Sequence, residues 1–190
     1  IIGAGIVGCS AAYHLARLGW RDVVVIDKGP IFENDGSTSH APGSMFLTNP
    51  SKMMTEFASY SAELYGTLED PDDGPPLYRP VGGIEVATTP ERLEDLKRRH
   101  GWATSYGVES FLITPAEVKE KIPLIDDRVI LGGFYVPGDT NINGWHAARA
   151  LARDAVAEGD AEFIGDPSVM DIEVTNGRVS GVLTSQGRVG

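Results

Sequence analysis

The sequence predicts an α/β fold built on a parallel β-sheet, with a β-hairpin near the end of the chain. A glycine-rich turn, Gly3 to Gly8, stands between a short apolar strand and an amphipathic helix. A second apolar strand, Asp22 to Ile26, follows that helix without polar alternation, as is typical of a parallel strand buried on both faces. Strand, helix and strand in this order make a βαβ unit. The 190 residues suffice for one domain or for part of a larger one.

The composition predicts a folded and acidic protein. Hydrophobic residues make up 42% and charged residues 23% of the chain, a balance that is usual in globular domains. The 16 Lys and Arg against 27 Asp and Glu give a net charge of −11, which repels phosphate backbones and anionic lipid headgroups. We therefore expect neither nucleic acid nor a membrane as partner. A salt-adapted surface would explain the same excess of acids.

The cysteine count and the hydropathy exclude further classes of protein. The single cysteine, Cys9, rules out an internal disulfide framework and a cysteine-based zinc site, and we expect it to pack within the first helix. No metal chemistry is indicated. The longest strongly apolar stretch, Val23 to Ile26, is far short of the roughly 20 residues that cross a bilayer, so we expect a soluble protein. The chain begins at Ile1 within a strand, and we treat both of its ends as truncated.

The first βαβ unit carries a pattern for binding a dinucleotide. Gly3, Gly5 and Gly8 form a G-x-G-x-x-G motif, in which they permit a tight turn, close approach of a pyrophosphate, and close packing of helix on strand. The helix that follows offers N–H groups and a partial positive charge to that pyrophosphate. Asp27 lies 19 positions after Gly8, near the offset of an acid that binds a ribose hydroxyl. We interpret the unit as a Rossmann-like site for an adenine dinucleotide, in preference to a glycine turn without a ligand.

A long connection, Lys28 to Gly43, follows the second strand. Its centre, Gly36 to Gly43, reads Gly-Ser-Thr-Ser-His-Ala-Pro-Gly, and loops of this length are usually functional or disordered. Glycines and small hydroxyl residues suit close contact with a flat or phosphorylated ligand, and His40 is the one nucleophilic side chain among them. The residues alone do not decide between such a site and a solvated loop.

The later elements follow from spacing and caps. Asn49 as N-cap with Pro50 predicts a helix that buries one apolar face, and the acidic, proline-containing run 69–76 predicts a solvated surface loop without chemistry. The remaining expected elements are a strand over 83–88, a helix from Pro90 to about Gly101, a helix opened by the capping box of Thr114, a strand over 129–136, a helix capped by Asn143, and a hairpin that turns at Asn176-Gly177. His146, in the first turn of the Asn143 helix, has no evident partner, and His14 and His100 are interpreted as structural.

Four segments together carry a resemblance. They are Ile2 to Gly8, Val25 to Pro30, Gly36 to Gly43 and Val81 to Ala87. In these segments, and through nearly the whole chain, the sequence resembles the dimethylglycine oxidase, dimethylglycine dehydrogenase and sarcosine dehydrogenase family of D-amino-acid-oxidase-like flavoproteins. The Ser-Thr-Ser-His-Ala-Pro-Gly segment makes the resemblance specific, because generic Rossmann proteins lack it.

The resemblance implies FAD as the cofactor, joined covalently through His40 to the 8α-methyl group of the flavin. A neutral imidazole nitrogen is a competent nucleophile for that bond. Ser44 stands where an apolar residue is expected, although a backbone contact would survive the change. The expected cofactor-binding residues, from motif and resemblance together, are Gly3, Gly5, Ile6, Val7, Gly8, Asp27, Lys28, Ser37, Thr38, Ser39, His40, Ser44 and Val169.

The resemblance also implies oxidative N-demethylation of a small N-methylated amino acid, with oxygen or an electron-transfer flavoprotein as acceptor. The chain would be the N-terminal part, 1–190, of an FAD-dependent oxidoreductase domain, without the substrate-side residues and without a C-terminal region that binds tetrahydrofolate. We therefore nominate no catalytic residue. The expected location is the cytoplasm, or the mitochondrial matrix in a eukaryote. Two alternatives remain: another dehydrogenase or oxidase of the same fold, NAD(P)-linked or with noncovalent FAD, and a noncatalytic regulatory relative.

Overall fold

The computed structural model of the chain describes residues 1–33, 35–72, 74 and 76–190. The polypeptide forms two compact units, each assembled from separate stretches of chain. Unit 1 contains 1–42, 68–77 and 143–190, and unit 2 contains 43–67 and 78–142. No helix in the described part of the chain has both the length and the hydropathy that crossing a bilayer demands.

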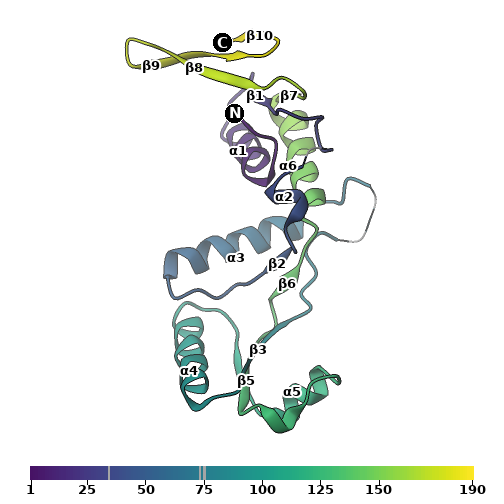
Figure 1. The fold of residues 1–190 in the computed structure, drawn as a ribbon, viewed down its shortest axis with the longest axis vertical. Coiled ribbons are helices and arrows are strands. Elements are labelled where there is room, and N and C mark those ends of the chain that lie inside the picture. The colour runs from purple at the N-terminus through teal and green to yellow at the C-terminus, as the bar shows by residue number, and fades with distance from the viewer. Residues whose placement is uncertain (34, 73, 75) are drawn as a thin grey trace. The chain divides into compact units, whose positions relative to one another are not determined.

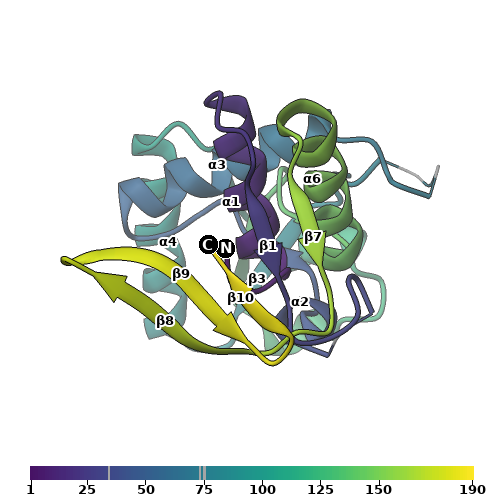
Figure 2. The same cartoon turned by 90° about the horizontal axis from the view of Figure 1, so that it is seen from above.

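Unit 1 is organised around a short parallel sheet, as predicted. Its strands are β1 (Val24–Ile26) and β7 (Glu162–Ile164), and Ile2 adds a parallel bridge to Ile26. Helices α1 (Ile6–Arg17) and α6 (Gly144–Gly159) pack against each other beside these strands (Figures 1 and 2). Alanines form most of the buried face of α6, which lets the two helices approach closely. The sheet therefore brings the start of the chain beside residues far along it.

A three-stranded antiparallel sheet ends unit 1. It consists of β8 (Val169–Thr175), β9 (Arg178–Thr184) and β10 (Gly187–Val189), in the order β10-β9-β8. Asn176 and Gly177 join the first two strands with φ values of 54° and 76°, the left-handed pair that a type I′ turn requires. The predicted hairpin is confirmed, and β10 extends it by one strand.

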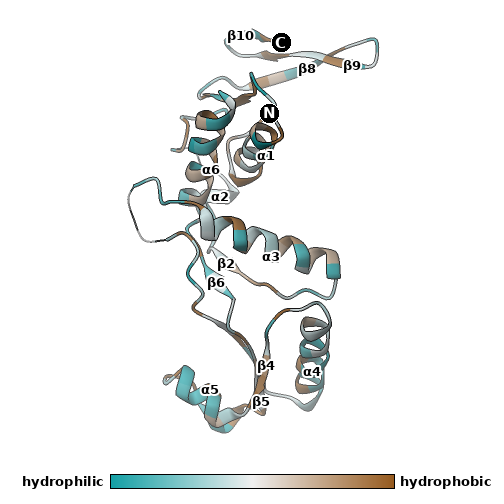
Figure 3. Cartoon of the chain, turned by 180° about the vertical axis from the view of Figure 1, so that it is seen from behind, coloured by the Kyte–Doolittle hydropathy of each residue, from teal (hydrophilic) through white to brown (hydrophobic). Residues whose placement is uncertain are grey.

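Unit 2 contains a second antiparallel sheet. Its strands are β3 (Gly83–Ala87), β5 (Gly132–Val136) and β4 (Phe111–Ile113), in that order, and hydrophobic residues run along β4 and β5 in Figure 3. Helix α4 (Pro90–Ser105) packs on the sheet and closes a small core. The short pair β2 (Ser44–Met45) and β6 (Thr140–Asn141) lies apart from this sheet. The buried core residues are Ala87, Leu96, Ala103, Val108, Phe134 and Val136.

Several predicted boundaries in unit 2 need correction. Helix α4 continues four residues beyond Gly101, and 129–131 is not strand, because a 3₁₀ turn occupies Asp127–Val129 before β5 begins. The capping box of Thr114 is confirmed at the start of α5 (Pro115–Lys121): the Thr114 hydroxyl accepts from the Glu117 N–H, and the Glu117 carboxylate accepts from the Thr114 N–H.

The prediction for the helix after Asn49 was wrong in two respects. Helix α3 spans Lys52–Thr67, so Pro50 lies outside it, and the Asn49 side chain instead accepts from the Ser51 N–H. The expected buried face is largely exposed: its side chains retain about half of their accessible surface. The exposed fractions are 58% for Met53, 47% for Met54, 58% for Phe57 and 51% for Tyr60.

Candidate functional site

The glycine turn before α1 is as tight as the motif predicts. Gly3 has a φ of 98°, which favours glycine. A Cβ on Gly8 would lie 1.8 Å from the Gly3 carbonyl oxygen, so any side chain there would force the first turn of α1 away from the strand. A Cβ on Gly5 would approach the Thr38 hydroxyl to 3.0 Å. The three glycines therefore keep backbone, rather than side chains, at the edge of the sheet.

Asp27 follows β1 directly, and its carboxylate accepts a hydrogen bond from the glycine turn. Its side chain is 7% exposed; one oxygen accepts the Ala4 N–H at 2.7 Å and the other accepts the Gly29 N–H at 3.1 Å. The carboxylate thus ties the glycine turn to the second strand.

The connection after Asp27 contains a short helix that the sequence did not predict. Helix α2 covers Ser37–His40, and the Thr38 hydroxyl oxygen accepts the Ile6 N–H at 2.9 Å. That N–H is one of the donors that a helix leaves without an internal partner, so Thr38 caps α1 from a distant part of the sequence. No local pattern signals such a cap.

Aromatic packing holds the same connection in place. Phe32, with a φ of 63°, sets its ring 5.9 Å from that of Trp145 and 6.0 Å from that of Phe163. Trp145 lies in the first turn of α6 and Phe163 in β7. The connection is therefore anchored to the helix and strand that complete unit 1.

These parts surround an open cavity of about 400 Å³ in unit 1, within the size range of small-molecule and cofactor sites. Eight of the predicted residues line it: Gly3, Gly5, Asp27, Lys28, Ser37, Thr38, Ser39 and Val169. The lining also includes residues that the sequence analysis missed, namely Ile2, Ile26, Asp35, Gly36, Trp145, Pro167 and Ser168. The sequence offered one signal for some of these residues, namely their position beside predicted ones. Trp145 follows the predicted cap Asn143, and Pro167 and Ser168 precede the predicted Val169.

Five predicted residues are outside that lining. Ile6 and Gly8 belong to the first turns of α1, where Gly8 is buried against Gly3, and Val7 is 80% exposed. Ser44 lies in unit 2, where it pairs with Asn141. His40 ends α2 immediately after the lining residues, and its side chain is 69% exposed.

Cys9 is fully buried behind the turn, where its thiol donates to the Ala4 carbonyl. Burial, with the nearby Asp27 charge, raises the pKa of the Cys9 thiol to about 12. A thiol with so high a pKa is not a nucleophile near neutral pH. The packing role expected for this residue is confirmed.

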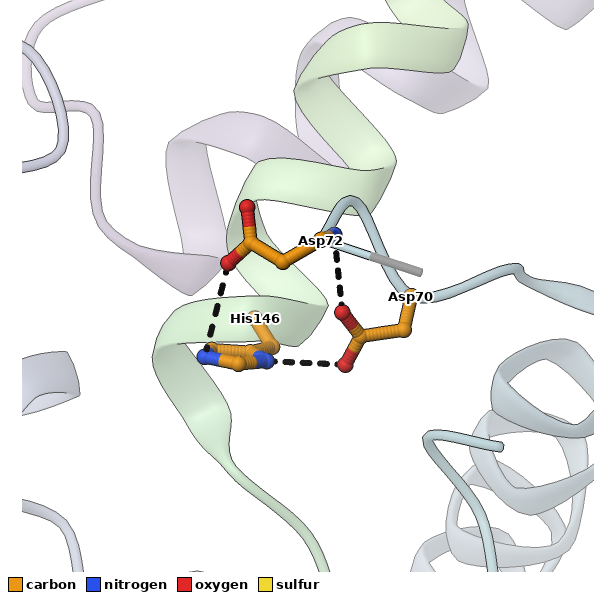
Figure 4. Close-up of side chains that lie close together, drawn as sticks. All are labelled: Asp70, Asp72 and His146. Atoms are coloured by element: carbon orange, nitrogen blue, oxygen red, sulfur yellow. Dashed lines mark hydrogen bonds and ion pairs between the residues drawn. The ribbon is translucent and has the colours of Figure 1, made fainter. Parts of the chain in front are cut away.

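A second polar cluster shows that two expectations were wrong, one for the acidic run 69–76 and one for His146. The His146 Nδ1 lies 2.8 Å from an Asp70 carboxylate oxygen, and its Nε2 lies 3.9 Å from an Asp72 carboxylate oxygen. Figure 4 shows how the two carboxylates meet the ring. Arg149 binds Asp72 through both terminal nitrogens at 2.6 and 2.8 Å. The acidic run is thus not simply solvated, although Asp73 and Pro75 lie outside the described residues, and His146 does have a partner. The hydrogen bond from His146 lowers the pKa of Asp70, and that from Arg149 lowers the pKa of Asp72.

We define Asp70, Asp72, His146 and Arg149 as the clasp. The Asp70 side chain is 4% exposed, and its loop belongs to unit 1 although the flanking residues belong to unit 2. His146 and Arg149 both come from the first two turns of α6. Asp70 and Asp72 also provide negative charge at the positive end of that helix. The clasp therefore holds the loop 68–77 against α6, the helix whose first-turn residue Trp145 lines the cavity.

Comparison with known proteins places the whole chain in one family. Residues 1–190 match the family of FAD dependent oxidoreductases, so the chain belongs to this family of flavoproteins. The α/β fold with a parallel sheet, expected from the glycine motif, is that of its structural neighbours.

Three relatives illustrate the range of the similarity. The chain is 37% identical over 155 residues to dimethylglycine dehydrogenase of Rattus norvegicus, covering 82% of this chain and 18% of the relative. It is 31% identical over 195 residues to sarcosine dehydrogenase of Homo sapiens, covering 100% and 21%. It is 33% identical over 189 residues to the pyruvate dehydrogenase phosphatase regulatory subunit of Mus musculus, again covering 100% and 21%. The chain spans about a fifth of the length of these curated relatives.

Solved structures agree on the fold. The L-proline dehydrogenase of P. horikoshii superimposes with a TM-score of 0.87 at 26% identity, covering 99% of this chain and 49% of that one. The glycine oxidase of Bacillus cereus gives a TM-score of 0.78 at 25% identity, covering 99% and 52%.

Proposed function

We propose that this chain is the dinucleotide-binding part of a flavoenzyme that oxidises a small N-methylated amino acid. We also propose that His40 carries the flavin covalently. The cavity at the glycine turn is the observation that carries the proposal. Its wall combines backbone at Gly3 and Gly5 with the hydroxyls of α2 and the Asp27 carboxylate. Bare backbone suits a pyrophosphate, and the carboxylate suits ribose hydroxyls.

In this proposal each part of the cavity has a separate task. Gly3 and Gly5 let the pyrophosphate approach the backbone, Asp27 accepts from the ribose of the adenosine, and Val169 borders the adenine. Ser37 and Ser39 place hydroxyls on the α2 side of the cavity, while Thr38 keeps the turn and α2 together through its bond to Ile6. Gly8 acts through packing, and Lys28 contributes a positive charge at the cavity rim.

The substrate class rests on the relatives. Dimethylglycine dehydrogenase, sarcosine dehydrogenase and the 4-methylaminobutanoate oxidase of Paenarthrobacter nicotinovorans are all at least 30% identical to this chain. A bound flavin supplies a two-electron acceptor for the C–H bond of an N-methyl group. The protein's part is to hold that acceptor and to orient the amine beside it. Oxygen or an electron-transfer flavoprotein would take the electrons, and the mitochondrial relatives favour the matrix for a eukaryotic protein.

The experiment that tests the proposal is acid precipitation of the whole protein. We expect the pellet to keep its flavin absorbance, because a covalent bond survives denaturation. His40→Ala should release the flavin into the supernatant while leaving the fold intact, since the His40 side chain is 69% exposed. A yellow pellet from the His40→Ala protein would remove His40 from the proposal. Flavin in the supernatant of the unaltered protein would indicate a noncovalent relative.

One observation favours a second candidate function. The regulatory subunit of a phosphatase matches the full length of the chain at 33% identity, so the same fold occurs in a protein that its name describes as regulatory. Anaerobic mixing with dimethylglycine or sarcosine separates the two candidates. Loss of flavin absorbance supports the enzyme, whereas a bound flavin that neither amine bleaches supports the regulatory function.

A further inference from the structure

The first turn of α6 connects the clasp with the cavity. Gly144 packs on α2, and Trp145 lines the cavity. His146, the next residue, binds Asp70, which lies 76 residues earlier in the sequence. Asn143 caps the turn by accepting the N–H groups of Trp145 and His146, but it belongs to the same segment as the helix. The bond to Asp70 therefore ties the turn to a distant segment, as the cap does not.

Close contacts continue from this turn of α6 to the glycine turn. A Cβ on Gly144 would lie 3.4 Å from the Thr38 carbonyl oxygen, so α6 begins within about the width of a methyl group of α2. The Thr38 hydroxyl in turn accepts the Ile6 N–H at 2.9 Å, and a Cβ on Gly5 would lie 3.0 Å from that hydroxyl. Because packed interiors transmit displacements, a shift of the first turn of α6 would reach α2 and the glycine turn.

The bond between Asp70 and His146 is suited to fixing the turn. The Asp70 side chain is 4% exposed and that of His146 is 33% exposed, so water screens this bond less than a pair on the open surface. The Asp70 carboxylate also accepts the Asp72 N–H at 2.9 Å, which orients it toward the imidazole. An ionised acceptor makes the hydrogen bond from the His146 Nδ1–H shorter and stronger than a neutral one.

We propose that Asp70 and His146 are positioning residues for the bound dinucleotide: the bond between them fixes the first turn of α6, and with it Trp145 and α2, in the wall of the cavity. The proposal rests on the dinucleotide site proposed above. Neither Asp70 nor His146 is among the cavity-lining residues, so both act through the helix. Without their bond the wall would occupy several positions, and the apparent affinity would fall with the fraction of molecules in the binding-competent one.

Charge alone predicts a different result from positioning. The pyrophosphate of a dinucleotide is anionic, so removing the Asp70 carboxylate would favour its binding if only long-range electrostatics counted. Positioning predicts that loss of either partner, the carboxylate or the imidazole, weakens binding. The direction of the change in Asp70→Asn therefore separates the two effects.

The test is calorimetric titration with ADP of the whole protein, produced free of flavin under riboflavin starvation. ADP contains the adenosine and pyrophosphate of FAD but no flavin ring, so the result does not depend on covalent attachment. We expect Asp70→Asn and His146→Ala each to raise the Kd for ADP about 5- to 20-fold, the lower part of the usual range of coupling between sites. The double variant should bind no more weakly than the weaker single variant, because both substitutions remove the same bond.

Two further variants separate positioning from a general loss of stability. All titrations are made well below the melting temperature of every variant, where lower stability alone leaves the Kd unchanged. His146→Asn should restore most of the affinity, because its amide donates from near the position of Nδ1. The matched control is Asp154→Asn, which removes another α6 carboxylate, one that pairs with Arg153 and is not among the cavity-lining residues.

Each outcome has a defined meaning. If the unaltered protein does not bind ADP, or binds it no better than Asp27→Ala does, the proposed dinucleotide site fails and the positioning role fails with it. If the unaltered protein binds ADP better than Asp27→Ala, and Asp70→Asn and His146→Ala leave the Kd unchanged, only the positioning role fails. That role also fails if Asp70→Asn tightens binding, as charge alone predicts, or if Asp154→Asn weakens binding equally.

Discussion

Gly8 leaves no space for a side chain, because a Cβ would stand 1.8 Å from a backbone oxygen that cannot move aside. We expect Gly8→Ala to destabilise unit 1 by about 1–3 kcal/mol, the usual effect of overpacking, and to abolish tight FAD binding. Thermal unfolding and flavin titration measure the two effects. Gly101→Ala is the matched control: nothing lies within 4 Å of its added Cβ, and alanine in the interior of α4 should stabilise by roughly 0.5–1 kcal/mol. Equal behaviour of the two variants would show that the turn is not constrained by packing.

Asp139 in unit 2 is a buried carboxyl, 5% exposed, that accepts the Leu47 N–H. Burial raises the pKa of Asp139 to about 6. Its folded pKa is above the unfolded value of about 3.9, so the folded state binds the proton more tightly, and stability falls as pH rises from about 4 through 6. Asp139→Asn keeps the acceptor and removes this titration. The melting temperature of the variant relative to the unaltered protein should therefore increase between pH 4.5 and 7.5, and a constant difference would contradict the buried ionisation.

At the scale of single residues, the sequence identified those whose role depends on local spacing. The glycines and Asp27 are at motif positions: Gly3, Gly5 and Asp27 line one cavity, and Gly8 packs against Gly3. Thr38 and His146 acquire their partners from segments 32 and 76 residues away, and no local spacing encodes such contacts. Their roles became visible only when the elements had been placed together.

Among the elements, the clasp joins a loop to a helix through charge. The pKa of Asp70 is lowered by its bond to His146, so this carboxylate stabilises the fold above its unfolded pKa, and the stabilisation is lost as pH falls through the lower folded pKa. Asp70→Asn should lower the melting temperature at pH 7, and the deficit should shrink below about pH 4, where the unaltered protein also becomes protonated.

Asp72→Asn provides the comparison for this prediction. Asp72 pairs with Arg149 but its side chain is 50% exposed, so water screens the pair and the loss should be smaller than for Asp70→Asn. A larger loss for Asp72→Asn at pH 7 would mean that the outer pair, rather than the buried one, holds the loop.

Element types were predicted better than element boundaries or burial. Thr114 and Asn143 cap their helices as expected, because a cap depends on residues within one turn. The face of α3 was predicted incorrectly, because apolar spacing shows which side chains share a face and not what covers that face. Strands β4 and β7 have three residues each, too few for a periodic pattern to be visible.

For the molecule as a whole, α3 presents the largest departure from expectation. Met53, Phe57 and Tyr60 follow helical spacing and are each more than half exposed. In the 190-residue chain we expect Phe57→Ser to reduce binding of a hydrophobic dye while changing the free energy of unfolding by no more than about 0.5 kcal/mol. Phe134→Ala, at a core position 1% exposed, should instead cost about 3–5 kcal/mol. Comparable losses of stability for the two variants would show that the α3 face is covered.

The parallel pairing in unit 1 has a consequence for biosynthesis. Val24 pairs with Glu162, although residues 27–161, including all of unit 2, lie between the two strands. At about 5–20 residues per second, a ribosome needs on the order of ten seconds to supply the second strand after the first has emerged. During that interval β1 offers an unpaired edge to other nascent chains, and a chaperone that shields it should raise the yield of native protein.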